Sequence, residues 1–220
     1  MTETITLSSN ALLNELVDQF PKVTPNWPRL IEAFKRTDKY RLNLHRPDSI
    51  AGMVGELFMQ RYLKRWEGKS SRVIYSPIPN QARRKDFKFN ISELGNCQIA
   101  QREPHGYQTY AEWDAVMLID NLPTVFELKT SKPSQIPREV NGFLTPSTYR
   151  TRLLPFQEYF RTNTLGMVLI VPQGSFSEHS IAKHNFEQAG GKIGSLYTTS
   201  ERYYQEVENA VKQFKLFTHR

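Results

Sequence analysis

The stretch TYAEWDAVMLIDNLPTVFELKTSK, residues 109–132, decides the fold of this chain. Two apolar runs flank the dipeptide Asp120-Asn121, and both residue types tolerate the backbone conformations of tight turns. The pattern therefore predicts a β-hairpin. Charged residues interrupt its apolar runs, with Asp114 in the first and Glu127 and Lys129 in the second. Side chains two positions apart on a strand share a face, and the predicted pairing brings Asp114 beside the other two.

Two carboxylates and an ammonium group on one face of a mostly buried sheet are costly unless something binds there. Mg²⁺ prefers oxygen ligands and is often held by one or two carboxylates together with a substrate phosphate. Asp114 and Glu127 fit that need, and the backbone carbonyl of Leu128 would be a third ligand at an irregular strand edge. Lys129 would orient or deprotonate the attacking water, or stabilise developing negative charge. The alternative is an exposed ion pair on a wet sheet face, which stabilises little.

The chain has 220 residues and a formal net charge of +7, which favours a polyanionic partner, nucleic acid first and an anionic membrane surface second. Its single cysteine, Cys97, excludes an internal disulfide framework and a four-cysteine zinc site. The start of the chain lacks a secretion-signal pattern, and no apolar run approaches the ~18 residues of a membrane span. We expect a cytoplasmic protein, nuclear if eukaryotic, without membrane contact.

Periodicity along the rest of the chain predicts an α/β fold with a mixed central sheet between helices. A long Pro- and Gly-containing loop is expected over residues 132–146. The segment after it, residues 147–162, is expected to be a helix kinked at Pro155. The other predicted elements are helices at 8–20, 28–37, 49–66, 178–189 and 200–217, and strands at 72–78, 98–102, 165–172 and 191–199, the last at the sheet edge.

Two further segments carry charged candidates. Glu56 lies beside the apolar face of the helix at 49–66, where an ordinary rim glutamate is the alternative to a functional acid. The segment at 81–90 is strongly basic and carries interleaved phenylalanines, as expected of a surface that grips a phosphate backbone. A solvated charged loop is its alternative interpretation. The predicted nucleic-acid contacts there are Arg83, Arg84, Lys85 and Lys88.

The acid on one strand, followed by an acid–any–Lys triplet on the next, resembles the signature of the PD-(D/E)XK nuclease superfamily. Asp114 and the triplet Glu127-Leu128-Lys129 match it, while Trp113 replaces the proline of the family name. Glu56 matches an acid that the superfamily often carries on its first helix. The resemblance implies a restriction-endonuclease-like core over residues 47–220, preceded by an N-terminal helical extension at residues 1–46 that packs on it. It also implies Mg²⁺ or Mn²⁺ as cofactor, with Glu56, Asp114, Glu127 and Lys129 as the catalytic residues.

A weaker resemblance concerns RecB-like exonucleases, some of which carry a Gln–three residues–Tyr motif on the following helix. Gln157 matches its first position, but Arg161 stands where the tyrosine would be; both residues are candidate nucleic-acid contacts. No P-loop is present, so we expect no nucleotide cofactor. The sequence thus favours a metal-dependent DNA endonuclease, which is expected to act as a homodimer because duplex DNA needs two cuts. A non-catalytic nucleic-acid-binding module and a regulatory protein with a surface ion network are the alternatives.

Overall fold

A computed structural model describes residues 6–36, 47–75, 87–91 and 96–216 of the chain. In the described residues, helices come first, six strands follow, and helices and strands alternate after them. One helix segment, Tyr149–Leu153, is a π-helix, and Phe20–Lys22 form a 3₁₀ helix. In chain order the elements are α1 (Ala11–Gln19), α2 (Trp27–Lys35), α4 (Pro47–Glu67), β1 (Val73–Tyr75), β2 (Phe87–Ile91), β3 (Cys97–Glu103), β4 (Gly106–Trp113), β5 (Ala115–Ile119), β6 (Leu122–Leu128), α5 (Ile136–Phe143), α6 (Pro146–Thr148), α7 (Leu154–Phe160), β7 (Gly166–Gln173), α8 (Ile181–Gln188), β8 (Lys192–Thr199) and α9 (Ser200–Leu216).

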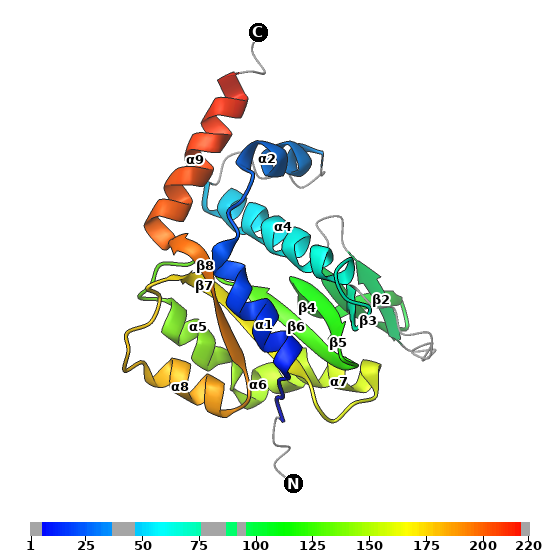
Figure 1. The fold of residues 1–220 in the computed structure, drawn as a ribbon. Helices are drawn as coiled ribbons and strands as arrows, with labels where there is room; N and C mark the ends of the chain where they lie inside the picture. Colours follow the sequence, from blue (N-terminus) through cyan, green and yellow to red (C-terminus); the bar gives the residue numbers. More distant parts are fainter. Residues whose placement is uncertain (1–5, 37–46, 76–86, 92–95, 217–220) are drawn as a thin grey trace.

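A mixed five-stranded sheet in the order β1-β5-β6-β7-β8 forms the centre of the molecule, with helices on both faces (Figure 1). Strands β6, β7 and β8 are parallel, whereas β5 is antiparallel to both of its neighbours. The predicted α/β class with a mixed sheet between helices is confirmed, and β8 is the edge strand. Because the three parallel strands run the same way, their carboxyl ends lie at one edge of the sheet.

The two faces of this sheet bury separate apolar clusters, because successive side chains of a strand alternate between faces. Phe126 and Leu128 of β6 point into a cluster shared with α1, α2, α4 and α9. Val125 of the same strand points into the other cluster, where α5, α7 and α8 supply the cover. Leu13 of α1 and Phe34 of α2 are buried in the first cluster, so both N-terminal helices contribute to the main core.

The hairpin between β5 and β6 turns at Asp120-Asn121, as predicted. Both residues have positive φ, 52° and 63°, which is the requirement of a two-residue type I′ turn. The strands then pair from Ile119 opposite Leu122 to Ala115 opposite Phe126. This register places Asp114, one residue before β5, directly across from the end of β6.

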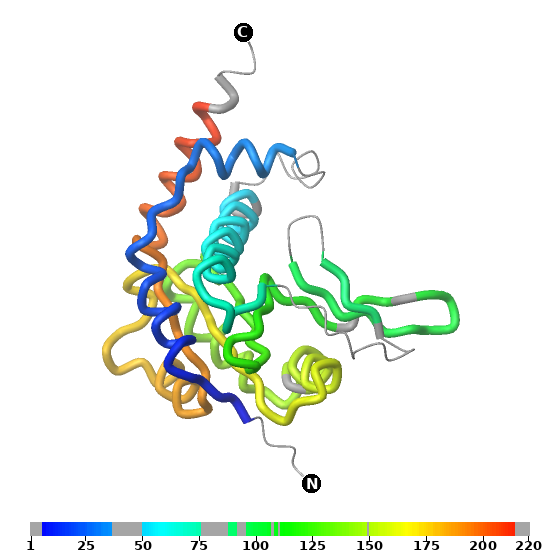
Figure 2. Tube along the Cα trace, turned by 45° about the vertical axis from the view of Figure 1, so that its right-hand side comes forward, coloured from blue at the N-terminus to red at the C-terminus, as the bar shows by residue number. Residues whose placement is uncertain are grey.

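The sequence prediction is wrong about the strand that carries Asp114. Residues 109–119 do not form one continuous strand, because β4 ends at Trp113 and β5 begins at Ala115. Strand β4 instead belongs to a second, three-stranded antiparallel sheet in the order β2-β3-β4. Figure 2 shows this second sheet extending away from the body of the molecule. Asp114 therefore lies at the junction between two sheets.

Two other expectations need correction. The segment predicted as the loop 132–146 contains α5, and Pro137 is in the first turn of that helix, where the missing N–H of proline costs nothing. The helix predicted over residues 147–162 is divided into α6, a π-helical turn and α7. Pro155 lies in the first turn of α7, so the irregularity precedes the proline. Within the described residues, no helix is long and apolar enough to cross a membrane.

Candidate functional site

The end of the β5–β6 hairpin brings two buried carboxylates together. Asp114 and Glu127 are 8% and 4% exposed. The backbone N–H of Leu128 donates to Asp114 Oδ2 at 2.7 Å, which fixes this carboxylate against the end of β6. Among the described residues, this is the one hydrogen-bond donor to the Asp114 carboxylate.

Helix α4 also contacts this junction, through the side chain of Gln60. The buried amide of Gln60 donates to the Asp114 carbonyl oxygen at 2.7 Å, so the break between the two sheets is held by a side chain. One helical turn earlier, Glu56 is half-buried and accepts a hydrogen bond from Asn96 Nδ2 at 3.3 Å. Glu56 is near enough to Asp114 for its negative charge to raise the pKa of Asp114.

Burial and like charge act together on Asp114. Its removal from water raises its pKa well above the ordinary value, and the nearby negative charges of Glu127 and Glu56 raise this pKa further. The Leu128 hydrogen bond and the positive charge of Lys129 oppose the rise without cancelling it. A carboxylate in this setting is stabilised by an added cation, because the cation relieves both penalties.

Lys129 lies on the same face as Glu127, as the two-residue spacing predicts. Its ammonium group is 2.7 Å from Glu127 Oε1. Burial lowers the pKa of Lys129, but the charge of Glu127 and this hydrogen bond outweigh that effect, so the pKa is raised overall. The amine is therefore protonated at neutral pH in this arrangement, which suits charge stabilisation and positioning better than proton abstraction.

Sequence reasoning missed one charged member of this site, Arg152. Its guanidinium donates to Glu127 Oε2 at 3.1 Å and to Glu127 Oε1 at 3.4 Å. The same group donates to the Glu112 carbonyl oxygen at 2.6 Å and lies 4.2 Å from the centre of the Trp113 ring. Arg152 thus joins β4, the strand that ends just before Asp114, to the buried acid of β6.

Local sequence carries only an indirect signal for Arg152. The residue lies on the π-helical turn Tyr149–Leu153, and such turns are frequent at functional sites. A sequence reader sees only a helix with several arginines, and nothing distinguishes Arg152 from Arg150. The link to Glu127 becomes visible only when the fold brings residues 25 positions apart into contact.

The predicted nucleic-acid contacts have mixed outcomes. Arg83, Arg84 and Lys85 lie outside the described residues. Lys88 is exposed on β2, and Arg161 is exposed at the end of α7, where it adopts a left-handed conformation with φ of 52°. Both positions thus lie on the surface of the protein.

Gln157 is buried rather than exposed. Its amide donates to the Asn163 carbonyl oxygen at 3.4 Å, at the turn that follows α7. That position leaves little surface for contact with a substrate. The weak resemblance to RecB-like exonucleases, which depended on this residue, therefore gains no support from its placement.

The donor set suits a hard divalent cation, although side chains alone do not complete a site. Among the described residues, no three histidine, cysteine or acidic side chains are grouped as a metal centre. Two carboxylates with a backbone carbonyl and water are nevertheless a common donor set for Mg²⁺. The buried Asp114, with its raised pKa and acidic neighbours, is the feature that a cation would stabilise. Asp114 and Glu127 supply oxygen donors of the type that such an ion prefers, although both oxygens of Glu127 accept hydrogen bonds from Lys129 or Arg152 in this structure. The Leu128 carbonyl as a third donor stays a prediction.

Comparison with protein-family models, with curated proteins and with solved structures gives no match to this chain. The role of the site therefore rests on its own geometry and chemistry.

Proposed function

We propose that this chain is a metal-dependent deoxyribonuclease of the PD-(D/E)XK type with a restriction-endonuclease-like core. The observation that carries the proposal is the meeting of Asp114 and Glu127 at the end of one hairpin, with Lys129 2.7 Å from Glu127 and Glu56 beside them. The central sheet supports it further, because the hairpin strands β5 and β6, which bring the two acids together, adjoin the parallel strand β7 inside a mixed sheet.

The residues have distinct roles in this proposal. Asp114 and Glu127, with the Leu128 carbonyl, would hold Mg²⁺ or Mn²⁺, and Glu56 would position water as an accessory acid. When bound, the ion supplies a more acidic water and charge neutralisation at the phosphoryl oxygens. The protonated Lys129 would hold the water in line and stabilise the negative charge that develops on the phosphate.

The substrate is proposed to be DNA, because the net charge of +7 favours a polyanion. An endonuclease is favoured over a RecB-like exonuclease, given the burial of Gln157. A homodimer is proposed as well, since cutting both strands of a duplex needs two sites. Sedimentation of the protein with and without DNA measures this assembly.

A cleavage assay on supercoiled, linear and branched DNA tests the activity in Mg²⁺, in Mn²⁺ and in EDTA. The wild type should cut only with metal, and Asp114→Ala and Lys129→Ala should not cut. Lys183→Ala, which changes an exposed lysine paired with Glu187, is the matched control and should cut normally. Cutting in EDTA, or cutting unaffected by both site variants, would contradict the assigned site.

A second candidate function is a non-catalytic nucleic-acid-binding module. The contacts of Arg152 and Lys129 with Glu127 favour it, because two cations already neutralise this acid without a metal ion. Binding of DNA at low salt without cleavage under any metal condition would select this candidate. The absence of DNA binding at low salt, where electrostatic affinity is greatest, would contradict both candidates and leave an ion network with a regulatory or structural role.

A further inference from the structure

A cavity of about 1300 Å³ lies at the sheet edge where the parallel strands end. The carboxyl ends of β6, β7 and β8 all open into it, through Thr130, Gln173 and Thr199. Clefts outside the carboxyl ends of parallel strands are the usual ligand sites of open α/β sheets. The volume exceeds the roughly 300–1000 Å³ typical of sites for small molecules.

The cavity and the candidate site share two elements. The chain runs from Glu127 and Lys129 directly into Thr130, Ser131 and Lys132, which line the cavity. Helix α4 contributes Ile50 and Ala51 to the cavity, and it carries Glu56 toward Asp114 just over one turn later. A polymer with one group at the candidate site would therefore reach the cavity along the same edge of the sheet.

Hydrogen bonds between buried groups hold the walls in place. Tyr203 Oη donates to the Ala51 carbonyl oxygen at 2.6 Å, which joins α9 to α4. The hydroxyl of Ser200 lies 3.3 Å from the Thr130 carbonyl oxygen, joining α9 to the end of β6. The close approach of Tyr203 on α9 to helix α4 requires Gly55, because a Cβ atom at position 55 would lie 2.5 Å from Tyr203 Oη. The cavity is thus formed before any ligand binds.

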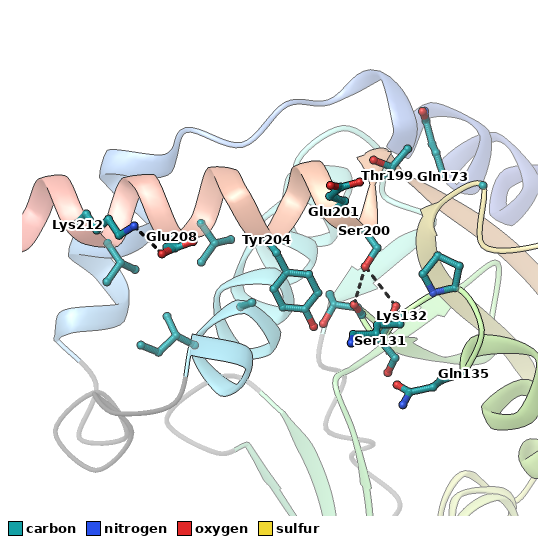
Figure 3. A pocket seen from close by; sticks show the side chains of 17 residues that line it. Ser131, Lys132, Gln135, Gln173, Thr199, Ser200, Glu201, Tyr204, Glu208 and Lys212 are labelled. Carbon is teal, nitrogen blue, oxygen red and sulfur yellow. Dashed lines mark hydrogen bonds and ion pairs between the residues drawn. The ribbon is translucent and has the colours of Figure 1, made fainter.

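Helix α9 presents an aromatic and apolar stripe to the cavity. Tyr204, Val207 and Val211 follow helical spacing and form this stripe, beside Glu201, Glu208 and Lys212 of the same helix. Figure 3 shows the Tyr204 side chain projecting from α9 into the hollow, toward the segment that carries Ser131 and Lys132. An aromatic face opposite hydrogen-bonding groups is the pairing that proteins use for unpaired bases.

The charges of the side chains that line the cavity favour a single-stranded ligand over a duplex. The described lining contains two lysines and two glutamates, and one pair of them, Lys212 and Glu208, is joined at 2.6 Å. A wall with balanced charge is poorly suited to a duplex, which carries one phosphate charge per ~1.7 Å of its axis. It suits a strand whose bases face the protein and whose few phosphates meet Lys132.

We propose that this cavity binds an unpaired segment of the nucleic-acid strand next to the phosphodiester at the candidate site, with a base stacked on Tyr204. The proposal rests on the proposed nuclease function and adds its substrate class: DNA with a single-stranded segment, such as an overhang, a flap or an opened junction. Gln135 and Gln173, which also line the cavity, would meet the edges of the bases with their amides.

Fluorescence anisotropy of labelled oligonucleotides tests the proposal in EDTA, so that binding is measured without cleavage. The probes are a short single strand, a blunt duplex of the same sequence and that duplex with a single-stranded overhang. The wild type should bind the single strand and the overhang more tightly than the blunt duplex. Tyr204→Ala should weaken single-strand binding about tenfold, the loss of one stacked base.

Tyr204→Phe keeps the ring and should bind as the wild type does, and Lys132→Ala should weaken binding with a reduced salt dependence. Thermal unfolding of each variant checks that the fold is retained. If Tyr204→Ala does not fold, photo-crosslinking of a 5-iododeoxyuridine single strand to the wild-type protein decides instead, with the crosslink expected at Tyr204.

Failure of this proposal is distinguishable from failure of the proposed function. Metal-dependent cleavage with unchanged single-strand binding in Tyr204→Ala, or a crosslink mapped away from the cavity, would overturn the cavity assignment and leave the nuclease intact. Single-strand binding lost in Tyr204→Ala, together with no cleavage in any metal, would support the cavity and overturn the nuclease. Tighter binding of the blunt duplex than of the single strand would also overturn the cavity assignment.

Discussion

Asp114 and Glu206 are two acids of this fold in opposite environments. Glu206, on α9, accepts hydrogen bonds from Trp27 Nε1 at 3.0 Å, Tyr197 Oη at 2.5 Å and Arg202 Nε at 3.0 Å. Burial raises the pKa of Glu206, but these bonds outweigh burial and lower the pKa overall. Asp114 is deeper, faces other acids and has a raised pKa.

These opposite pKa shifts distinguish two kinds of acid: Glu206 stabilises the fold, whereas the fold leaves the charge of Asp114 poorly compensated. The three donors to Glu206 come from α2, β8 and α9, so its charge ties these elements together. The environment of Asp114 disfavours its charge and provides one backbone donor. Natural proteins retain such costs mainly where function requires them. The comparison therefore favours Asp114, and not Glu206, as the acid that a bound cation would stabilise.

The largest expected effect is that of Asp114→Asn on DNA cleavage, a loss of at least about 100-fold. The same substitution should raise the free energy of unfolding at neutral pH, because the amide keeps an acceptor for the Leu128 N–H without a buried charge. Plasmid cleavage and urea unfolding of the purified variant measure the two effects. A variant that cuts normally, or that is less stable than the wild type at neutral pH, would place Asp114 with the structural acids.

The pH dependence of this stability difference has a definite sign. Since the pKa of Asp114 is raised, its contribution to stability is present below its ordinary value of 3.8 and is lost as pH rises through the folded-state pKa. The stability advantage of Asp114→Asn over the wild type should therefore grow as pH rises from about 3.8 toward neutrality. Urea unfolding at a series of pH values follows it.

The second effect in size is that of Arg152→Gln on stability. Removal of a guanidinium that donates to both oxygens of buried Glu127 should cost about 2 kcal/mol without metal. The cost should shrink in Mg²⁺, because the ion then supplies positive charge to the same acid. Arg202→Gln is the matched control, and it should cost at most about 1 kcal/mol, because Arg202 is largely exposed. Thermal unfolding with and without Mg²⁺ measures both, and an equal cost in the two conditions would count against metal at Glu127.

The smallest effect is expected for Glu206→Gln, a loss of about 1 kcal/mol of stability with unchanged cleavage. Because the pKa of Glu206 is lowered, its stabilisation is present above its ordinary value of 4.5 and is lost as pH falls through the folded-state pKa. The difference between the wild type and Glu206→Gln should therefore vanish in acid, as it does for Asp114→Asn. At neutral pH the two differences have opposite signs, because Glu206→Gln is less stable than the wild type and Asp114→Asn is more stable. Urea unfolding over the acidic range measures this stability difference. Loss of cleavage in Glu206→Gln would contradict the assignment of Glu206 as a purely structural acid.

The hairpin and its acids could be predicted from sequence because their signals are local. Asp120-Asn121 specifies the turn, the turn fixes the register, and the register brings Asp114 to Glu127. The strand break at Asp114 was not predictable, since Trp113 and Ala115 both read as strand residues. Tertiary contacts interrupt the strand. The buried amide of Gln60 donates to the Asp114 carbonyl oxygen, and β4 pairs in a different sheet from β5.

Other features were missed because their signals depend on distant parts of the chain. Pro137 alone indicates a loop, but it lies in the first turn of α5. This helix forms because Ile136 and Val140 are buried in an apolar cluster. Arg152 reads as one more basic residue on a helix until the π-helical turn places it over Trp113. The cavity could not be predicted at all, because its walls come from four segments between Ile50 and Lys212 that are far apart in the sequence.

Calorimetric titration of Mg²⁺ and Mn²⁺ into the wild type, Asp114→Asn and Glu206→Gln tests the central claim most directly. The wild type and Glu206→Gln should bind the ion with equal affinity, and Asp114→Asn should lose binding. No binding to the wild type, or equal binding to Asp114→Asn, would contradict the claim that Asp114 and Glu127 hold a divalent cation.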